Sequence, residues 1–167
     1  MIWIKTALFI GTIVTVRYIF SFVNHDGDQK INKMKEIINF TEYLRVYSCD
    51  MKMSFEEIYE KYNFKSNDTK MIINSMINFL KDKKSSKELL VYINNIMYTS
   101  ETFNTFFTEI IDYYGCTYSD ILDKKLNFTI EEMEKYLDEY TIKHNEKKTL
   151  NNRISLLAGC LAAIILV

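Results

Sequence analysis

The sequence has no proline and only four glycines in 167 residues, so it lacks the residues that punctuate turn-rich folds. This scarcity disfavours a β-sandwich or barrel and indicates helices joined by short polar connections. The formal net charge is only -1, and no basic patch with interleaved aromatic residues is present. A nucleic-acid partner is therefore not expected.

Residues with distinctive chemistry are also scarce. Three cysteines, Cys49, Cys116 and Cys160, lie far apart and are typical of free thiols in a reducing compartment. The two histidines, His25 and His144, lack the spacing of a metal pair and are expected on the surface. The sequence contains no glycine-rich phosphate loop, zinc-protease motif or activated-serine motif. These observations predict no enzyme, with no catalytic residues, no cofactor, no metal and no small-molecule substrate.

The first 23 residues form an apolar segment that only two charged residues, Lys5 and Arg17, interrupt. As a helix, residues 2–23 would reach ~30 Å, the thickness of a bilayer core. Arg17 would extend to the nearer headgroups. We therefore favour an N-terminal transmembrane helix over residues 1–23. Two alternatives stay open: a cleaved signal peptide, for which residues 20–23 are a poor cleavage site, and a soluble helix that would have to bury Arg17.

The last stretch, residues 119–167, contains no proline, and Gly159 is its only glycine. Its apolar residues first recur in steps of four and three, which places them on one helical face: Leu122, Leu126, Ile130, Met133, Leu137 and Tyr140. From Ile154 onward the predicted helix is apolar on every face, which favours a position in lipid. We expect one continuous helix with residues 151–167 as a C-terminal transmembrane helix. The alternative is a break at Asn127, because Thr129 and Glu132 have the spacing of a capping box.

The C-terminal span is short, ~21 Å for residues 154–167, so packing against the N-terminal span is expected. Gly159 and Ala163 have the spacing of small residues at membrane helix contacts. The basic residues next to the two spans lie almost entirely on the side of the middle domain: Lys30, Lys33, Lys35, Lys143, Lys147, Lys148 and Arg153, with Lys5 alone on the far side. The charge distribution predicts a cytoplasmic middle domain, with membrane lipid around the two spans.

Residues 24–150 are predicted to form a cytoplasmic helical bundle of six helices. The first covers about residues 28–47, the next four begin near capping or polar residues, and the long helix from Ser119 is the sixth. The four intermediate starts are Ser54 (boxed with Glu57), Asn67, Ser85 (boxed with Glu88) and Ser100. Gly115 is expected to end the fifth helix.

Tyrosines flank the fifth predicted helix, and tyrosine is favoured at protein interfaces. We treat Tyr98, Tyr113 and Tyr118 as a candidate protein-contact surface, with ordinary half-buried residues as the alternative. The neighbouring stripe of Phe103, Phe106 and Phe107 has helical spacing and is predicted to be core.

The layout and three segments of the chain resemble the stage III sporulation protein AB family of endospore-forming bacteria. Residues 54–58 (Ser-Phe-Glu-Glu-Ile) resemble the family's start of the second helix, with Glu57 in register. Ser119 and Asp120 stand where the family has an aspartate ahead of its long helix. Residues 152–159 resemble its polar-to-apolar transition at the membrane. The resemblance covers nearly the whole chain, although Ser54 and Lys124 replace the family's common proline and glutamine.

The resemblance implies a GspF-like bundle, similar to the cytoplasmic domain of the platform protein of type II secretion and type IV pilus systems. It implies a non-enzymatic platform or scaffold subunit of the channel between mother cell and forespore, required for endospore formation and held in the mother-cell membrane. The implied partners are the other stage III sporulation A-type membrane proteins and their cytoplasmic secretion-type ATPase. Two alternatives stay open: a platform component of a secretion or pilus-like system, and a secreted or tethered helical binding module.

Overall fold

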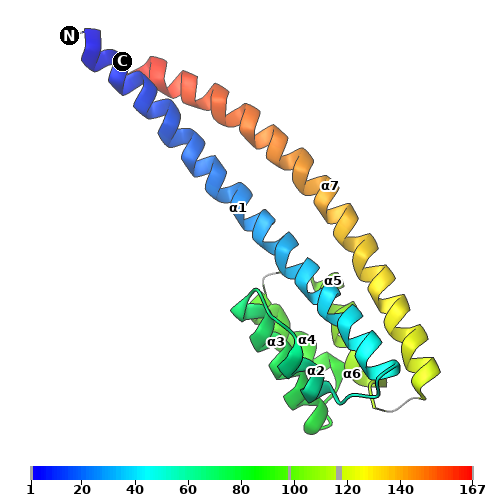
Figure 1. Cartoon of the computed structure of the whole chain (residues 1–167). Coiled ribbons are helices and arrows are strands. Elements are labelled where there is room, and N and C mark those ends of the chain that lie inside the picture. The colour runs from blue at the N-terminus through cyan, green and yellow to red at the C-terminus, as the bar shows by residue number, and fades with distance from the viewer. Residues whose placement is uncertain (1, 98, 116–117, 167) are drawn as a thin grey trace. The chain divides into compact units, whose positions relative to one another are not determined.

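The computed structural model describes residues 2–97, 99–115 and 118–166, and within these ranges every regular element is a helix. The predicted all-helical class is therefore confirmed. The helices in chain order are α1 (Ile2–Cys49), α2 (Phe55–Lys61), α3 (Asn67–Lys81), α4 (Ser86–Met97), α5 (Glu101–Thr108), α6 (Ile110–Tyr113) and α7 (Ser119–Leu166) (Figure 1).

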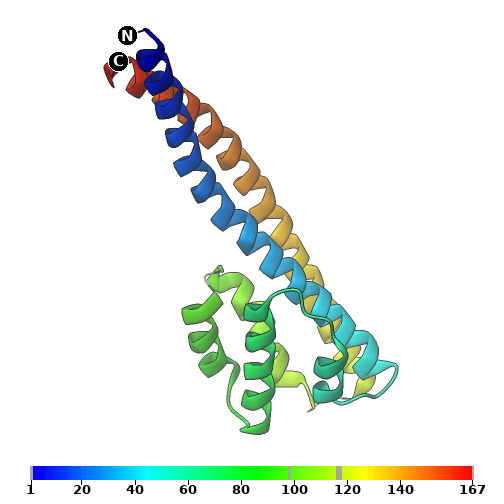
Figure 2. The same cartoon turned by 60° about the vertical axis from the view of Figure 1, so that its left-hand side comes forward.

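The chain divides into two compact units. We call Met1–Gln29 together with Glu139–Val167 the hairpin unit, and Lys30–Asp138 the helical domain. The long helices α1 and α7 each contribute to both units. Within the hairpin unit, α1 and α7 run side by side, and both chain ends lie at the same end of this unit (Figures 1 and 2).

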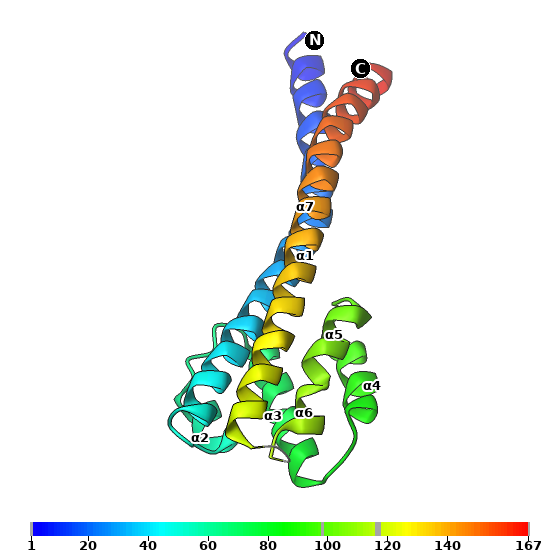
Figure 3. The same ribbon diagram turned by 90° about the vertical axis from the view of Figure 1, so that its right-hand side faces the viewer.

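The helical domain has a core to which each of its helices contributes apolar side chains. The face of α7 predicted from its four-and-three spacing is confirmed as buried from Leu122 to Leu137. Phe40 of α1 lies at the centre of an aromatic cluster. Helix α4 packs beside α5 (Figure 3). The largest fully buried side chains include Phe40, Phe103, Phe107, Met34, Ile37, Leu44, Ile58, Ile72, Ile73, Met76, Leu89 and Ile93.

Serine caps begin α2, α3, α4 and α5 at or within one residue of their predicted starts. Ser54 Oγ accepts a hydrogen bond from the Glu57 amide at 3.3 Å, and the Ser54 amide donates to Glu57 Oε2 at 2.9 Å. This reciprocal pair confirms the predicted capping box and satisfies two amides that the helix leaves unpaired. Ser85 Oγ accepts from the Glu88 amide at 3.4 Å, which places the first residue of α4 at Ser86.

Two helix boundaries differ from the prediction. The expected separate helices over residues 2–23 and 28–47 form the single helix α1, in which Gly27 is an interior residue without positive φ. The expected fifth helix is divided at Glu109 into α5 and α6, where the Thr108 hydroxyl donates to the Thr105 carbonyl and competes with the backbone ladder. Gly115 follows α6 with φ +78, a conformation that favours glycine.

Helix α7 is continuous from Ser119 to Leu166, so the alternative of a break at Asn127 is wrong. Thr129 does not cap a new helix, since its hydroxyl instead pairs with the Tyr113 hydroxyl at 2.6 Å. The Asn127 side chain donates to Glu131 Oε1 at 2.6 Å, one helical turn further along. Both polar side chains thus have partners that leave the helical backbone intact.

Candidate functional site

Helix α1 is long and apolar enough to cross a membrane by its length and composition, and it is the one such helix among the described residues. It contains an 18-residue apolar window of which no residue is buried by the chain itself. Large apolar side chains of the hairpin unit point outward from both helices: Trp3, Ile4, Leu8, Ile10, Val14, Tyr18, Ile19, Phe22 and Val23 from α1, and Ile154, Leu156, Leu157, Leu161, Ile164 and Ile165 from α7. Outward apolar side chains on every exposed side are typical of a lipid-facing surface.

Small residues line the contact between the two helices of the hairpin unit. A Cβ atom added at Gly159 would lie 3.2 Å from the Ile13 Cα, so the α7 backbone approaches α1 closely there. Ala163, one turn further, is fully buried, and Ser155, one turn earlier, is 2% exposed. The two residues predicted as membrane helix contacts, Gly159 and Ala163, therefore both lie on the side of α7 that faces α1.

Replacing Gly159 with leucine is expected to destabilise the hairpin unit by about 1–3 kcal/mol, because the new side chain meets α1 backbone that cannot yield. Gly11→Leu is the matched control, since nothing lies within 4 Å of a Cβ at Gly11. Thermal unfolding of the full chain in detergent micelles, followed by circular dichroism, measures both variants. Equal melting temperatures for the two would contradict the close contact.

A layer of three asparagines joins the helices where their apolar segments end. The Asn151 amide donates to Asn24 Oδ1 at 2.9 Å, and the Asn24 amide donates to Asn152 Oδ1 at 3.3 Å. Asn24 is only 5% exposed, so these bonds satisfy a side chain that would be costly to bury alone. The pairing holds the polar ends of the α1 and α7 apolar segments at one level.

One turn beyond the asparagines, a charged cluster joins the same helices. Lys148 Nζ donates to Asp28 Oδ2 at 2.7 Å, and His144 Nε2 lies 2.9 Å from Asp28 Oδ1. These two hydrogen bonds, that from Lys148 first, hold the pKa of Asp28 below its usual value. A Cβ at Gly27 would lie 2.1 Å from His144 Cε1, so only glycine leaves room for this ring.

The prediction of two surface histidines is correct for His25 and wrong for His144. The His144 side chain is 9% exposed and stacks on Tyr140 with 6.4 Å between ring centroids. Sequence reasoning missed this cluster because Gly27 and His144 come together only when the chain folds back on itself. The one available signal was a glycine inside a segment that also contained several polar residues.

The tyrosines predicted as a contact surface have different environments. Tyr118 is 85% exposed, whereas Tyr98 lies outside the described residues. Tyr113 is only 8% exposed, and its hydroxyl pairs with Thr129. Its proposed place on an exposed surface is therefore corrected: helix α6 is a single turn packed on the core, and its last residue faces inward.

Burial of two neighbouring phenols predicts a loss of stability at alkaline pH. Burial raises the pKa of Tyr113 to about 12 and that of Tyr114 to about 12, above the usual value of ~10. Their contribution to stability is fully present below pH ~10 and is lost as the pH rises towards ~12. We expect the urea midpoint to fall less over this range in Tyr113→Phe/Tyr114→Phe than in the natural chain. An equally steep fall in both proteins would contradict this assignment.

Within the part of the chain that the structure describes, no group of three His, Cys, Asp or Glu side chains is placed to hold a metal ion.

The contacts between α1 and α7 in the hairpin unit consist of close helix packing, an asparagine layer and an ion-pair cluster. These features fix the two helices together within the hairpin unit. The chain matches no family model, no curated protein and no solved structure in comparisons with known proteins.

Proposed function

We propose that this chain is a non-enzymatic, membrane-anchored scaffold subunit whose helical domain lies on the cytoplasmic side of the membrane. The observation that supports this best is the apolar window of α1, none of which is buried by the chain. A soluble helix of that composition would expose its whole apolar surface to water, at ~25 cal/mol for each Å². Lipid removes that cost.

The asparagine layer supports insertion of both helix ends together. Because Asn24 bonds to Asn151 and Asn152, the apolar segments of α1 and α7 begin at one level. From that level α1 extends ~33 Å and α7 ~21 Å at 1.5 Å per residue. We propose that α1 spans the bilayer, and that the shorter α7 end inserts against it through Gly159 and Ala163.

The charges around this level support the orientation. Lys148 and Arg153 lie near the asparagine layer on α7, whereas Lys5 is the one basic residue near the far end of α1. Basic residues favour the cytoplasmic side of a membrane. The Asp28–Lys148 ion pair, at the same end as this layer, would lie in the headgroup region or just inside the cytoplasm.

The more specific proposal is that the scaffold belongs to the sporulation channel between mother cell and forespore. It rests on the resemblance of residues 54–58, Ser119 with Asp120, and residues 152–159 to the stage III sporulation protein AB family. In the structure Ser54 caps α2 and α7 begins at Ser119. The proposed partners are the other membrane proteins of that complex and its cytoplasmic ATPase.

Deleting the gene in the native organism tests the sporulation proposal. We expect loss of heat-resistant spores, with forespores that are engulfed but do not mature, and recovery when the natural gene is restored. Normal spore numbers in the deletion strain would contradict the sporulation role and leave the anchored scaffold as a separate proposal. Arrest before engulfment would place the protein at an earlier step and would also contradict it.

Cysteine labelling in intact cells tests the anchor and its orientation. In a chain whose three native cysteines are replaced, Asn74→Cys in α3 and Lys5→Cys in α1 both provide exposed thiols. We expect a membrane-impermeant maleimide to label Lys5→Cys in intact vegetative cells, and Asn74→Cys only after permeabilisation. The reverse pattern would contradict the orientation. Recovery of the protein in the soluble fraction would contradict the anchor.

A further inference from the structure

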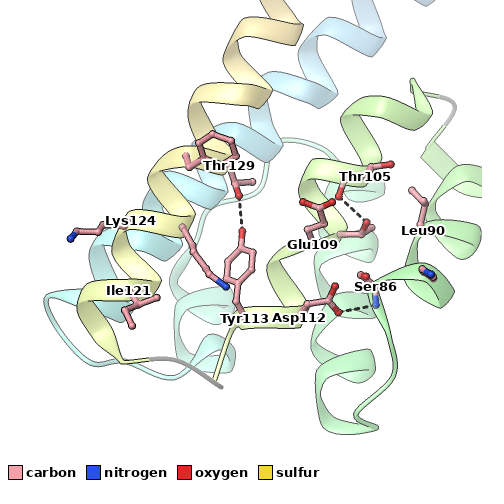
Figure 4. Close-up of a pocket in the computed structure, with 13 residues that line it drawn as sticks. Ser86, Leu90, Thr105, Glu109, Asp112, Tyr113, Ile121, Lys124 and Thr129 are labelled. Atoms are coloured by element: carbon pink, nitrogen blue, oxygen red, sulfur yellow. Dashed lines mark hydrogen bonds between the residues drawn. The ribbon is translucent and has the colours of Figure 1, made fainter.

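A groove of about 760 Å³ opens on the helical domain between α7 on one side and α4, α5 and α6 on the other (Figure 4). Ile121, Lys124, Lys125 and Phe128 line it from α7, whereas Ser86, Lys87 and Leu90 line it from α4. All these residues belong to the helical domain, so the groove is a feature of one compact unit. The groove has the helical walls that an added helix requires.

The α7 wall of the groove presents large apolar side chains to solvent. Phe128 is 63% exposed and Ile121 is 46% exposed, and a spacing of seven places them on one face, two turns apart. Leu122 and Leu126, on the adjacent face, are buried in the core. Exposed apolar side chains gathered along a groove mark an interaction site more often than scattered ones do.

Lysines lie on both edges of the groove. Lys87 stands on the α4 edge, and Lys124 and Lys125 stand on the α7 edge, with the Lys125 ammonium 5.0 Å from the centre of the Tyr113 ring. Two carboxylates lie between them, on the wall formed by α5 and α6. Asp112 Oδ1 accepts a hydrogen bond from the Ser86 amide at 3.2 Å and keeps its charge, so Asp112 and Glu109 together place negative charge between the two basic edges.

We propose that this groove binds an amphipathic helix of a partner protein whose apolar seam has acidic residues along both flanks. The seam would cover Phe128, Ile121 and Leu90, and the flanking carboxylates would face the lysines of the two edges. Glu109 and Asp112 disfavour acidic residues within the apolar seam itself. The inference deepens the proposed scaffold role, on which it rests for the existence of a partner.

Selection from a display library of amphipathic helical peptides tests the groove directly. The bait is the full chain in detergent micelles, and the library varies the apolar seam and contains acidic, neutral and basic flanks. We expect the selected peptides to have Asp or Glu on both flanks and to bind less tightly as salt concentration rises. Selection of peptides with basic flanks, or of none above background, would overturn the proposal.

Substitutions on exposed positions locate the binding. Lys87→Glu and Lys124→Glu are each expected to lower the binding affinity for the selected acidic peptides by about tenfold. Lys135→Glu, exposed on α7 outside the groove, is the matched charge control. Phe128→Ser removes an exposed apolar side chain of the groove and is also expected to weaken peptide binding, with Met71→Ser on α3 as its control. Circular dichroism checks that each variant remains folded. If the groove variants and the control variants lower the peptide affinity equally, the assignment of binding to the groove is overturned.

A sporulation assay distinguishes failure of the groove proposal from failure of the proposed sporulation role. If deletion blocks sporulation while the Lys87→Glu/Lys124→Glu chain supports normal spores, the groove proposal fails and the scaffold role stands. If the deletion strain forms normal spores while acidic peptides still bind the groove, the sporulation role fails and the binding site stands. If the double variant accumulates in the membrane but fails to sporulate, and its groove no longer binds the acidic peptides, the groove proposal is supported.

Discussion

Replacing Phe40 with alanine is expected to lower the free energy of unfolding by about 3–5 kcal/mol. The Phe40 side chain is fully buried on α1. Its ring centroid lies 5.8 Å from that of Phe55, 5.2 Å from that of Tyr62 and 5.6 Å from that of Phe64. Alanine would remove three aromatic contacts and leave a cavity among side chains from α1, α2 and the segment that follows α2. Urea unfolding of the full chain in micelles measures the change.

Phe128→Ala is the control for this prediction, because it removes the same atoms from a side chain that is 63% exposed. Its expected effect is within about 0.5 kcal/mol. A similar loss in both variants would contradict the position of Phe40 at the centre of the aromatic cluster. The same outcome would show that Phe128 is covered in the free protein, which would also count against an open groove.

Replacing Glu36 with alanine is expected to cost about 2–3 kcal/mol of stability. Glu36 is 6% exposed, and its Oε1 atom accepts hydrogen bonds from the backbone amides of Lys65 and Ser66. These amides lie just before α3, so the carboxylate fixes the segment between α2 and α3 against α1. Alanine would leave two amide donors without this acceptor, whereas Glu36→Gln retains an acceptor oxygen and is expected to cost less.

Glu42→Ala provides the comparison, because Glu42 is exposed on the same helix. Its loss is expected to change stability by no more than about 0.5 kcal/mol. Hydrogen exchange of the Lys65 and Ser66 amides adds a local measurement, since both should exchange faster in Glu36→Ala than in Glu36→Gln. Unchanged exchange of these two amides would contradict the bonding to Glu36.

Periodicity along the chain predicted most of the secondary structure and one face of the core. The step pattern from Leu122 to Leu137 identified the buried side of α7, because a helix places such residues on one face whatever else surrounds it. Local capping chemistry was equally readable, as at Ser54 and Glu57, since both partners lie within one helical turn. Features set by neighbours in sequence were therefore predictable.

Contacts between distant residues were not predictable in the same way. Asp28 and His144 are 116 positions apart, and no local pattern joins them. Gly27 was compatible with a break in α1, yet it lies inside the helix, and the His144 ring occupies the space that a side chain there would fill. Tyr113, a tyrosine near a helix end, was compatible with a surface position. Its burial and its pairing with Thr129 show that it faces inward.

By itself, the sequence determined an all-helical chain with apolar segments at both ends, because composition and helical period act within a few residues of each other. The tertiary structure alone decided which residues hold the two long helices together: Gly159 against Ile13, Asn24 against Asn151 and Asn152, and Asp28 against Lys148. It also decided where the lysine-edged groove opens, since its walls come from four separate helices, α4 to α7. The physical reason is that helix propensity is local, whereas packing and hydrogen bonding depend on which surfaces the folded chain brings together.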